Sequence, residues 1–276
     1  MPVNDAMKGK TVLVTGSTDG IGKATALGLA QMGAKVLLHG RDPEKGRRVH
    51  DEIARTTGND QLDLFIADLA SQRQVRRLAA EVMETYESLH VLINNAGTFQ
   101  VEHRLTEDGL ETTFAVNYLT PFLLTHELLE RLEESSPSRI INVASIAHLN
   151  AKVDWNNLQG ERWYDGFEAY ALSKLGIVLF TYELAKRLKG SAVTANCLHP
   201  GVIKTKLLRA GFGDYPGSPP EKGARNSIYL ASSPDVKGIS GEYFMECRPA
   251  KSSPLSYNKD LQERFWELAE TFTGTA

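Results

Sequence analysis

Cysteine, net charge and long apolar runs are scarce in this chain, and each shortage excludes a class of protein. Cys197 and Cys247 are its two cysteines, which is neither a disulfide framework nor a CxxC metal motif. The 31 Lys and Arg residues nearly balance the 34 Asp and Glu residues. This balance argues against nucleic-acid binding, because phosphate backbones select a basic face. No stretch approaches the roughly 18 apolar residues of a transmembrane helix.

Targeting signals and metal motifs are also missing. The opening residues, MPVNDAMKGK, lack the apolar core of a secretory signal, and two isolated cysteines fit a reducing compartment. We therefore predict a soluble, cytoplasmic protein without a transmembrane segment. The seven histidines form no HExxH motif and no His/Cys cluster, so we expect no catalytic metal.

Short, nearly continuous apolar runs alternate with longer amphipathic segments. Such runs are typical of strands buried on both faces of a parallel sheet. The alternation predicts an α/β fold, a Rossmann-type doubly wound parallel sheet of about seven strands with helices on both faces. The expected strands are 11–15, 35–39, 62–66, 89–93, 139–143, 192–198 and 241–245. The expected helices are 20–32, 43–57, 71–86 with Ser71 as N-cap, 106–134 (or two helices meeting near Pro121) and 167–189 with Gly190 as C-cap.

No composition break marks a linker, so residues 1–276 are predicted to form a single domain. Segments 146–166 and 205–220 interrupt the pattern and are interpreted as substrate loops, because long loops in compact domains are usually functional. Residues 258–272 are predicted to form a C-terminal helix. That helix either packs on the domain, covers the substrate mouth or forms an oligomer contact.

A glycine-rich turn lies between the first expected strand and the first expected helix. Its residues are Thr15, Gly16, Ser17, Thr18, Asp19, Gly20, Ile21 and Gly22. Glycines let a backbone approach a pyrophosphate closely, and the following helix presents free N–H groups to the phosphates. Its position after a strand and before a helix makes the motif informative.

The end of the second expected strand selects between the two dinucleotides. An acidic residue there would bind the ribose of NAD, whereas this chain has Gly40 followed by Arg41. An arginine fork matches the 2′-phosphate of NADP. We therefore predict that NADP(H) is preferred and that NAD(H) remains possible, with Asp42 as the residue that could favour NAD. Asp68 follows the third strand, where it can meet the adenine edge.

Tyr170 and Lys174 are four residues apart on an expected helix, so both side chains lie on one face. An ammonium beside a phenol favours the phenolate, and we expect Lys174 to lower the pKa of Tyr170 toward a useful acid/base range. Ser145 ends the fifth expected strand. Its hydroxyl would project at the carboxyl edge of the sheet, where open α/β folds bind ligands.

Together these residues resemble the short-chain dehydrogenase/reductase family, in the subgroup with TGxxxGxG and YxxxK motifs. The matching segments span nearly the whole chain and are Thr15–Gly22, Asp68-Leu69, Asn94–Gly97, Asn117, Ser145, Tyr170–Lys174 and Pro200–Thr205. The branch that it resembles most is the retinol dehydrogenase-like and WW-domain oxidoreductase-like one. Residues 146–149, 158–160, 184–188, 198–201 and 240–244 carry that narrower resemblance. Members of this branch commonly have an N-terminal anchor, which is not seen here before the first strand.

The resemblance implies a role for each catalytic candidate. Tyr170 would donate the proton to the carbonyl oxygen, and Lys174 would lower its pKa and hold the nicotinamide ribose. Ser145 would orient the substrate oxygen, and Asn117 would position a water that links Lys174 to solvent. The implied cofactor-binding residues are Gly16, Ser17, Thr18, Asp19, Gly20, Ile21, Gly22, Arg41, Asp68, Leu69, Asn95, Ala96, Gly97, Tyr170, Lys174, Pro200, Gly201, Val202 and Thr205. Asp19 departs from some NADP-preferring relatives, which carry a basic residue there.

The function predicted from the sequence is an NADP(H)-dependent oxidoreductase that interconverts a hydrophobic carbonyl and its alcohol by hydride transfer. Apolar residues in the two substrate loops favour hydrophobic aldehydes or ketones, and relatives imply that a homo-oligomer is possible. The alternative is a catalytically silent NADP(H)-binding regulatory or scaffold protein, because fold alone does not prove activity. His148 and His199 fall near the cleft, where a hydrogen-bonded structural role is favoured over a contact to substrate.

Overall fold

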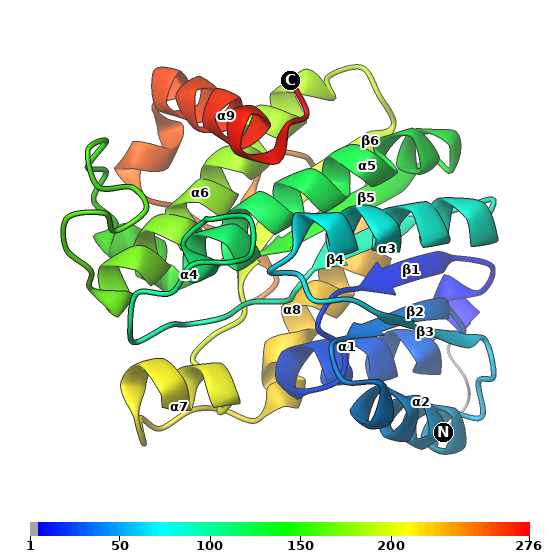
Figure 1. The fold of residues 1–276 in the computed structure, drawn as a ribbon. Helices are drawn as coiled ribbons and strands as arrows, with labels where there is room; N and C mark the ends of the chain where they lie inside the picture. Colours follow the sequence, from blue (N-terminus) through cyan, green and yellow to red (C-terminus); the bar gives the residue numbers. More distant parts are fainter. Residues whose placement is uncertain (1–4) are drawn as a thin grey trace.

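A computed structural model describes residues 5–276 as an α/β domain around one eight-stranded sheet (Figure 1). The strand order is β3-β2-β1-β4-β5-β6-β7-β8. The strands are β1 (Thr11–Val14), β2 (Lys35–Gly40), β3 (Leu62–Ile66), β4 (Val91–Asn94), β5 (Ser138–Val143), β6 (Val193–His199), β7 (Tyr243–Met245) and β8 (Arg248–Pro249). The chain reverses its direction of travel across the sheet between β1 and β4. Crossovers on the two sides of that point create the crevice in which doubly wound folds bind ligands.

The predicted sheet is confirmed, with one addition. Strands β1 to β7 pair in parallel, whereas β8 pairs with β7 in an antiparallel register, Met245 opposite Arg248. This eighth strand is two residues long and follows a tight turn at Glu246 and Cys247, both with positive φ. A strand of two residues carries no periodicity and could not be predicted from the sequence.

Helices cover both faces of the sheet (Figure 1). They are α1 (Gly20–Gln31), α2 (Pro43–Thr57), α3 (Gln72–Thr85), α4 (Thr112–Phe114), α5 (Thr120–Glu134), α6 (Gly166–Arg187), α7 (Lys206–Phe212), α8 (Pro220–Ser232) and α9 (Lys259–Thr273). A π-turn, η2 (Ala115–Leu119), joins α4 to α5. The 3-10 turns are η1 (Asp5–Met7), η3 (Ile146–Asn150), η4 (Pro234–Val236) and η5 (Pro254–Tyr257).

Alternate residues of each strand feed two separate cores, because successive side chains point to opposite faces. Val12 and Val14 pack with α1, α2 and α8 on one face. Leu13 packs with α3, α5 and α6 on the other. All three side chains have no exposed surface. The apolar runs of the central strands therefore reflect burial on both sides.

Two predicted helix boundaries and one predicted loop differ from the structure. The segment expected to begin a helix at residue 106 instead forms a bridge between Leu105 and Glu111, and Glu111 caps α4. Gly190 does not cap α6, which ends at Arg187 with Leu188 as its C-cap, although Gly190 takes φ +94°. The expected substrate loop at 205–220 contains α7, capped by the Thr205 hydroxyl. The C-terminal helix is confirmed as α9, which packs against α6.

Both edges of the sheet are covered or interrupted. On the outer side of β3, the His50 ring bonds the carbonyl of Leu62 at 3.1 Å. The Arg77 guanidinium donates to the carbonyl of Ile66 at 2.8 Å. At the opposite edge, Pro249 ends β8 and has no N–H to offer. Exposed edge strands are templates for pairing with other chains, and these features reduce that template.

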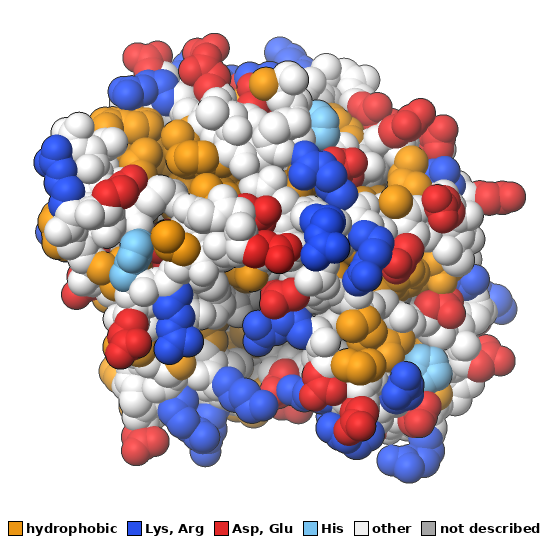
Figure 2. Space-filling model, viewed as in Figure 1, with side chains coloured by type: hydrophobic (Ala, Val, Ile, Leu, Met, Phe, Trp, Pro, Cys, Tyr) orange, Lys and Arg blue, Asp and Glu red, His pale blue; other side chains and the backbone are white. Residues whose placement is uncertain are grey.

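The surface in the same orientation shows acidic and basic side chains interspersed (Figure 2). Apolar side chains emerge between them in small groups on this face. Among residues 5–276, no helix combines the length and apolar character that crossing a bilayer requires.

Candidate active site

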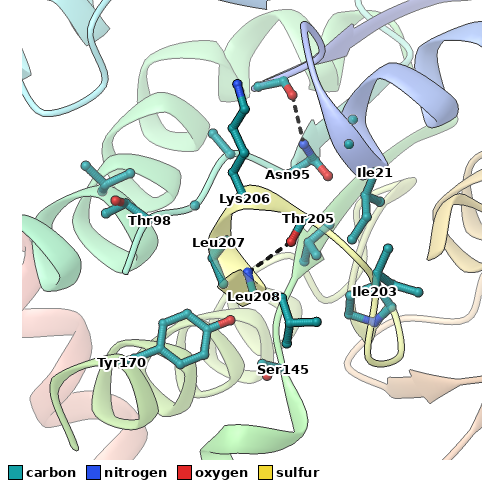
Figure 3. A pocket seen from close by; sticks show the side chains of 18 of the residues that line it. Ile21, Asn95, Thr98, Ser145, Tyr170, Ile203, Thr205, Lys206, Leu207 and Leu208 are labelled. Atoms are coloured by element: carbon teal, nitrogen blue, oxygen red, sulfur yellow. Dashed lines mark hydrogen bonds between the residues drawn. The ribbon is translucent and has the colours of Figure 1, made fainter. Parts of the chain in front are cut away.

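One cavity of about 710 Å³ opens at the carboxyl edge of the parallel strands. It is lined by the turns that follow β1, β2, β4, β5 and β6, by the first turns of α6 and by α7. Figure 3 shows Tyr170 and Ser145 at one end of it and Ile21 and Asn95 at the other, with residues 203–208 between them. The sheet topology thus brings segments from the whole chain to one space.

The glycine turn is shaped so that backbone lies directly against this cavity. Gly16 and Gly20 have φ values of +64° and +48°, which glycine adopts without strain. A Cβ at Gly22 would lie 2.3 Å from the Gly16 carbonyl oxygen. The first N–H groups of α1 have no partner within the helix. Together the open backbone and the helix terminus suit the phosphates of a dinucleotide.

The turn after β4 is bonded to this glycine turn. The Thr15 hydroxyl accepts hydrogen bonds from the amides of Asn95 and Ala96, at 2.9 and 3.0 Å. The Asn95 side chain donates to the Thr15 carbonyl at 2.8 Å. The two loops therefore form one unit, and Asn95, Ala96 and Gly97 line the cavity as predicted.

His39, near the end of β2, is hydrogen-bonded to the glycine turn. Its Nδ1 accepts from the Gly16 amide at 3.1 Å, and its Nε2 contacts the Ala67 carbonyl at 3.1 Å. This pairing requires a neutral ring protonated on Nε2. Burial lowers the pKa of His39 to about 4, so the ring is neutral at physiological pH. No motif in the sequence singles out His39.

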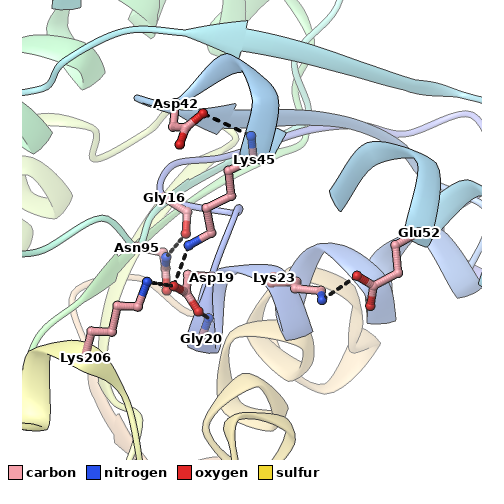
Figure 4. A network of polar contacts seen from close by, with 9 residues as sticks. All are labelled: Gly16, Asp19, Gly20, Lys23, Asp42, Lys45, Glu52, Asn95 and Lys206. Carbon is pink, nitrogen blue, oxygen red and sulfur yellow. Dashed lines mark hydrogen bonds and ion pairs between the residues drawn. The ribbon is translucent and has the colours of Figure 1, made fainter. Parts of the chain in front are cut away.

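Basic side chains gather where the second strand ends. Arg41 and Lys45 line the cavity together with Lys206 of α7. The Asp19 carboxylate pairs with Lys45 at 2.5 Å and with Lys206 at 3.1 Å (Figure 4). Burial opposes ionisation of Asp19, but the two lysines outweigh it and lower its pKa to about 2. The acidic departure at Asp19 is thus neutralised by two cations, and the local balance remains basic.

The predicted catalytic residues meet at the other end of the cavity. Tyr170 and Lys174 lie on the same face of α6, and Ser145 follows β5. The Lys174 ammonium donates to the Val143 carbonyl at 2.9 Å and lies 5.6 Å from the centre of the Tyr170 ring. The Ser145 hydroxyl accepts from the Ala147 amide at 3.2 Å and caps η3.

The protonation states of this group correct one expectation. Burial raises the pKa of Tyr170 to about 12, and the Ser145 hydroxyl opposes that rise. Burial also lowers the pKa of Lys174 to about 8. Lys174 is therefore not the group that sets the pKa of Tyr170 in this structure, contrary to the expectation from the four-residue spacing. Desolvation is the largest cause of both pKa shifts.

Asn117 lies beside the cavity and does not line it. Its side-chain oxygen accepts from the Thr98 amide at 2.8 Å, and its nitrogen donates to the Thr98 carbonyl and the Ser173 hydroxyl, both at 3.0 Å. The side chain is therefore fully bonded within the protein. Its carbonyl lies four residues before Pro121, which has no N–H to complete an α-helical bond. This is the atom of Asn117 that remains suited to a water.

The cavity gathers the predicted site residues with two exceptions, Asn117 and Ser17. Ser17 is fully buried, and its hydroxyl accepts from the His39 amide at 2.8 Å, so it faces β2 rather than the cavity. The structure adds Lys45, which lies four residues after Arg41 on the first turn of α2. The available signal for it was a second basic residue shortly after Arg41, in the first turn of the helix that follows β2.

This arrangement defines a dinucleotide-binding α/β domain with a tyrosine, a lysine and a serine at the substrate end. Comparison with known proteins gives the family. The family model described as short chain dehydrogenase matches residues 10–214. The chain belongs to this family and is an oxidoreductase of its alcohol–carbonyl class with a nicotinamide cofactor.

Several known proteins are similar over most of their length. Human retinol dehydrogenase 11 is 42% identical over 271 residues, covering 95% of this chain and 85% of that protein. The crystal structure of an uncharacterized protein from Mycobacterium paratuberculosis has a TM-score of 0.81 at 31% identity, covering 97% and 94%. A short chain dehydrogenase from Shigella flexneri, solved with NADP, has a TM-score of 0.73 at 26% identity, covering 87% and 98%.

Proposed function

We propose that this protein is an NADP(H)-dependent oxidoreductase that interconverts a hydrophobic aldehyde or ketone and its alcohol, with Tyr170 as the acid/base. The observation that carries the proposal is the convergence of Tyr170, Lys174 and Ser145 on the cavity that begins at the glycine turn. The residues at the glycine turn fit a dinucleotide, and proton transfer by Tyr170 requires the tyrosine and the cofactor to share one cavity.

The charge at the adenosine end favours NADP over NAD. Arg41 is 75% exposed and its nearest acidic partner, Asp68, is 4.0 Å away, so its guanidinium is available to a 2′-phosphate. Lys45 lines the same end of the cavity and adds a second cation near the expected place of the 2′-phosphate. The NADP in the similar Shigella flexneri structure supports this choice.

A bound nicotinamide supplies or accepts the hydride. Tyr170 supplies the proton, because its raised pKa keeps the phenol protonated and ready to donate to a developing alkoxide. Ser145 donates a hydrogen bond to the same oxygen and orients it. Lys174, with a pKa of about 8, would hold the nicotinamide ribose and return a proton toward Tyr170. The Asn117 carbonyl would hold the water that connects Lys174 to solvent.

Aromatic side chains indicate an apolar substrate. Phe212 of α7 packs against Phe99 and Phe167, with ring centres 5.8 and 5.9 Å apart. Phe99 in turn lies 5.5 Å from the Tyr170 ring. Phe167, Phe212 and Tyr215 line the cavity beside the proton donor. Such a wall binds the carbon skeleton of a substrate and leaves its oxygen to Ser145 and Tyr170.

The test is oxidation of NADPH by the purified protein with aliphatic, aromatic and isoprenoid aldehydes and ketones. Tyr170→Phe should lower kcat by about 10²- to 10⁴-fold, because a general acid contributes that much. The dissociation constant for NADPH should stay unchanged. Tyr229→Phe, on α8 outside the cavity, is the matched control. Equal turnover by wild type and Tyr170→Phe contradicts the mechanism, and tight NADPH binding without turnover supports the regulatory alternative.

A further inference from the structure

The peptide bond between Ser145 and Ile146 is held at both ends by imidazole rings. Nδ1–H of His148 donates to the Ser145 carbonyl oxygen at 2.6 Å. The N–H of Ile146 donates to Nδ1 of His199 at 3.2 Å. One ring comes from η3 and the other from the end of β6. A single peptide group therefore has side-chain partners on both its oxygen and its nitrogen.

These contacts require opposite tautomers in the two rings. A carbonyl oxygen only accepts, so His148 carries its proton on Nδ1. Its Nε2 is then free to accept from the Ser253 amide, which lies 3.0 Å away. An amide only donates, so His199 must leave Nδ1 bare and carry its proton on Nε2. Both rings work only when neutral, and burial lowers the pKa of each.

The rings are themselves fixed by the surrounding structure. His148 has no exposed surface and packs on the Tyr243 ring, with centres 4.9 Å apart. His199 is 8% exposed, and its carbonyl accepts from the Asn226 side chain at 3.3 Å. Ser253 belongs to the segment before α9, so His148 connects this peptide to the C-terminal part of the domain.

The peptide matters because it sets the direction of the Ser145 side chain. Ser145 has φ −161° and ψ 154°, and its hydroxyl caps η3. Rotation of the following peptide would change ψ and carry the hydroxyl away from the oxygen that it must orient. Polar groups that are misplaced by about 1 Å can cost 10²-fold in rate.

We propose that His148 and His199 are positioning residues that clamp the Ser145–Ile146 peptide in opposite tautomers and so aim the Ser145 hydroxyl at the substrate oxygen. This inference rests on the proposed function, since it assigns the hydroxyl its target. Neither ring donates a proton to substrate in this scheme. Each acts through the backbone of the serine.

Asparagine and glutamine variants separate the clamp from general stability. The amide of Asn reaches the place of Nδ1, so His148→Asn can donate to Ser145 and His199→Asn can accept from Ile146. Gln reaches the place of Nε2 and misses both atoms. We expect kcat of His148→Gln and His199→Gln to fall by at least about tenfold, with the NADPH dissociation constant unchanged. The two Asn variants should retain a kcat several-fold higher than that of the Gln variants. His126→Gln is the control, because His126 is exposed on α5.

Two readouts do not depend on turnover. Hydrogen–deuterium exchange should rise in the peptide covering residues 144–151 in the Gln variants and stay low in the Asn variants. Ring ¹⁵N shifts of the wild type should show Nδ1–H at His148 and Nε2–H at His199. An inactive wild type would defeat the proposed function, while the exchange and tautomer results would still decide the clamp. Identical kcat and exchange in the Asn and Gln variants, or the same tautomer at both rings, overturns it.

Discussion

The two ends of the cavity are built in opposite ways. At the cofactor end, buried polar groups satisfy one another, as in the bonds that join Thr15, Asn95 and His39 to the glycine turn. At the substrate mouth, large apolar side chains face solvent, with Tyr215 59% and Val202 41% exposed. We therefore expect the affinity for the cofactor to depend on a network of satisfied hydrogen bonds, and the choice of substrate to depend on side chains with few partners.

Acid should destabilise the domain through His39, which holds the glycine turn, and His199, which holds the Ser145–Ile146 peptide. The folded-state pKa of His39 and of His199 is about 4, below the unfolded value of about 6.5. The unfolded chain therefore binds more protons as pH falls, and stability present above pH 6.5 is lost progressively toward pH 4. At pH 5 the loss should be of the order of 2 kcal/mol for each ring. Urea unfolding at pH 7.5 and pH 5 measures it, and equal midpoints would contradict the assignment of neutral rings.

Removing one of these rings should cost nearly as much at neutral pH. His39→Ala leaves the Gly16 amide and the Ala67 carbonyl without their partner in a buried place. We expect a loss of about 3 kcal/mol in the free energy of unfolding, since unsatisfied buried groups and a cavity both contribute. NADPH should also bind more weakly. His126→Ala, at the surface, should change stability by less than about 0.5 kcal/mol. A His39→Ala protein as stable as that control would refute the support role.

The preference for NADPH over NADH should depend on the guanidinium of Arg41. Arg41→Ala should weaken NADPH binding by about 10- to 100-fold, the value of a charged hydrogen bond, and leave NADH binding unchanged. Titration of each cofactor by fluorescence measures this. Arg48→Ala is the control, because Arg48 lies on α2, the helix that follows Arg41, and is 68% exposed beside Glu44. An equal loss for NADH and NADPH would show that Arg41 does not read the 2′-phosphate.

The smallest effect on activity should come from a substitution at the substrate mouth of the cavity. Phe212→Ala removes a side chain that is 39% exposed, so about 1 kcal/mol of apolar contact is lost. The expected result is a several-fold lower kcat/KM for long apolar carbonyls, with the melting temperature and NADPH binding unchanged. A short carbonyl should be turned over as before. Equal losses for long and short substrates would argue against an aromatic wall that reads the carbon skeleton.

The same contrast explains how far the sequence alone could reach. The strands and most helices follow local periodicity, and the glycine turn, Arg41, Ser145, Tyr170 and Lys174 sit in recognisable positions. The cavity confirms that they share one space. A local sequence pattern does not show which distant residue a side chain will contact. Ser17 turns toward β2 because the His39 amide lies there.

Long-range contacts account for the remaining misses. The helix expected from residue 106 begins only at Thr112, because Leu105 and Glu111 pair across a short loop. The pKa of Tyr170 depends on how completely the folded domain excludes water, which spacing along α6 does not encode. His148 and His199 were expected to be hydrogen-bonded. That both hold the same peptide is a property of the tertiary structure.

The covered edges of the sheet limit self-association by strand pairing. A ring and a guanidinium cover two outer carbonyls of β3, and a proline ends the two-residue strand at the other side. Copies of this chain therefore find little backbone with which to extend one sheet into the next. Folded copies are therefore protected at the backbone groups where edge-to-edge strand pairing would begin. Any assembly would have to bury helices instead.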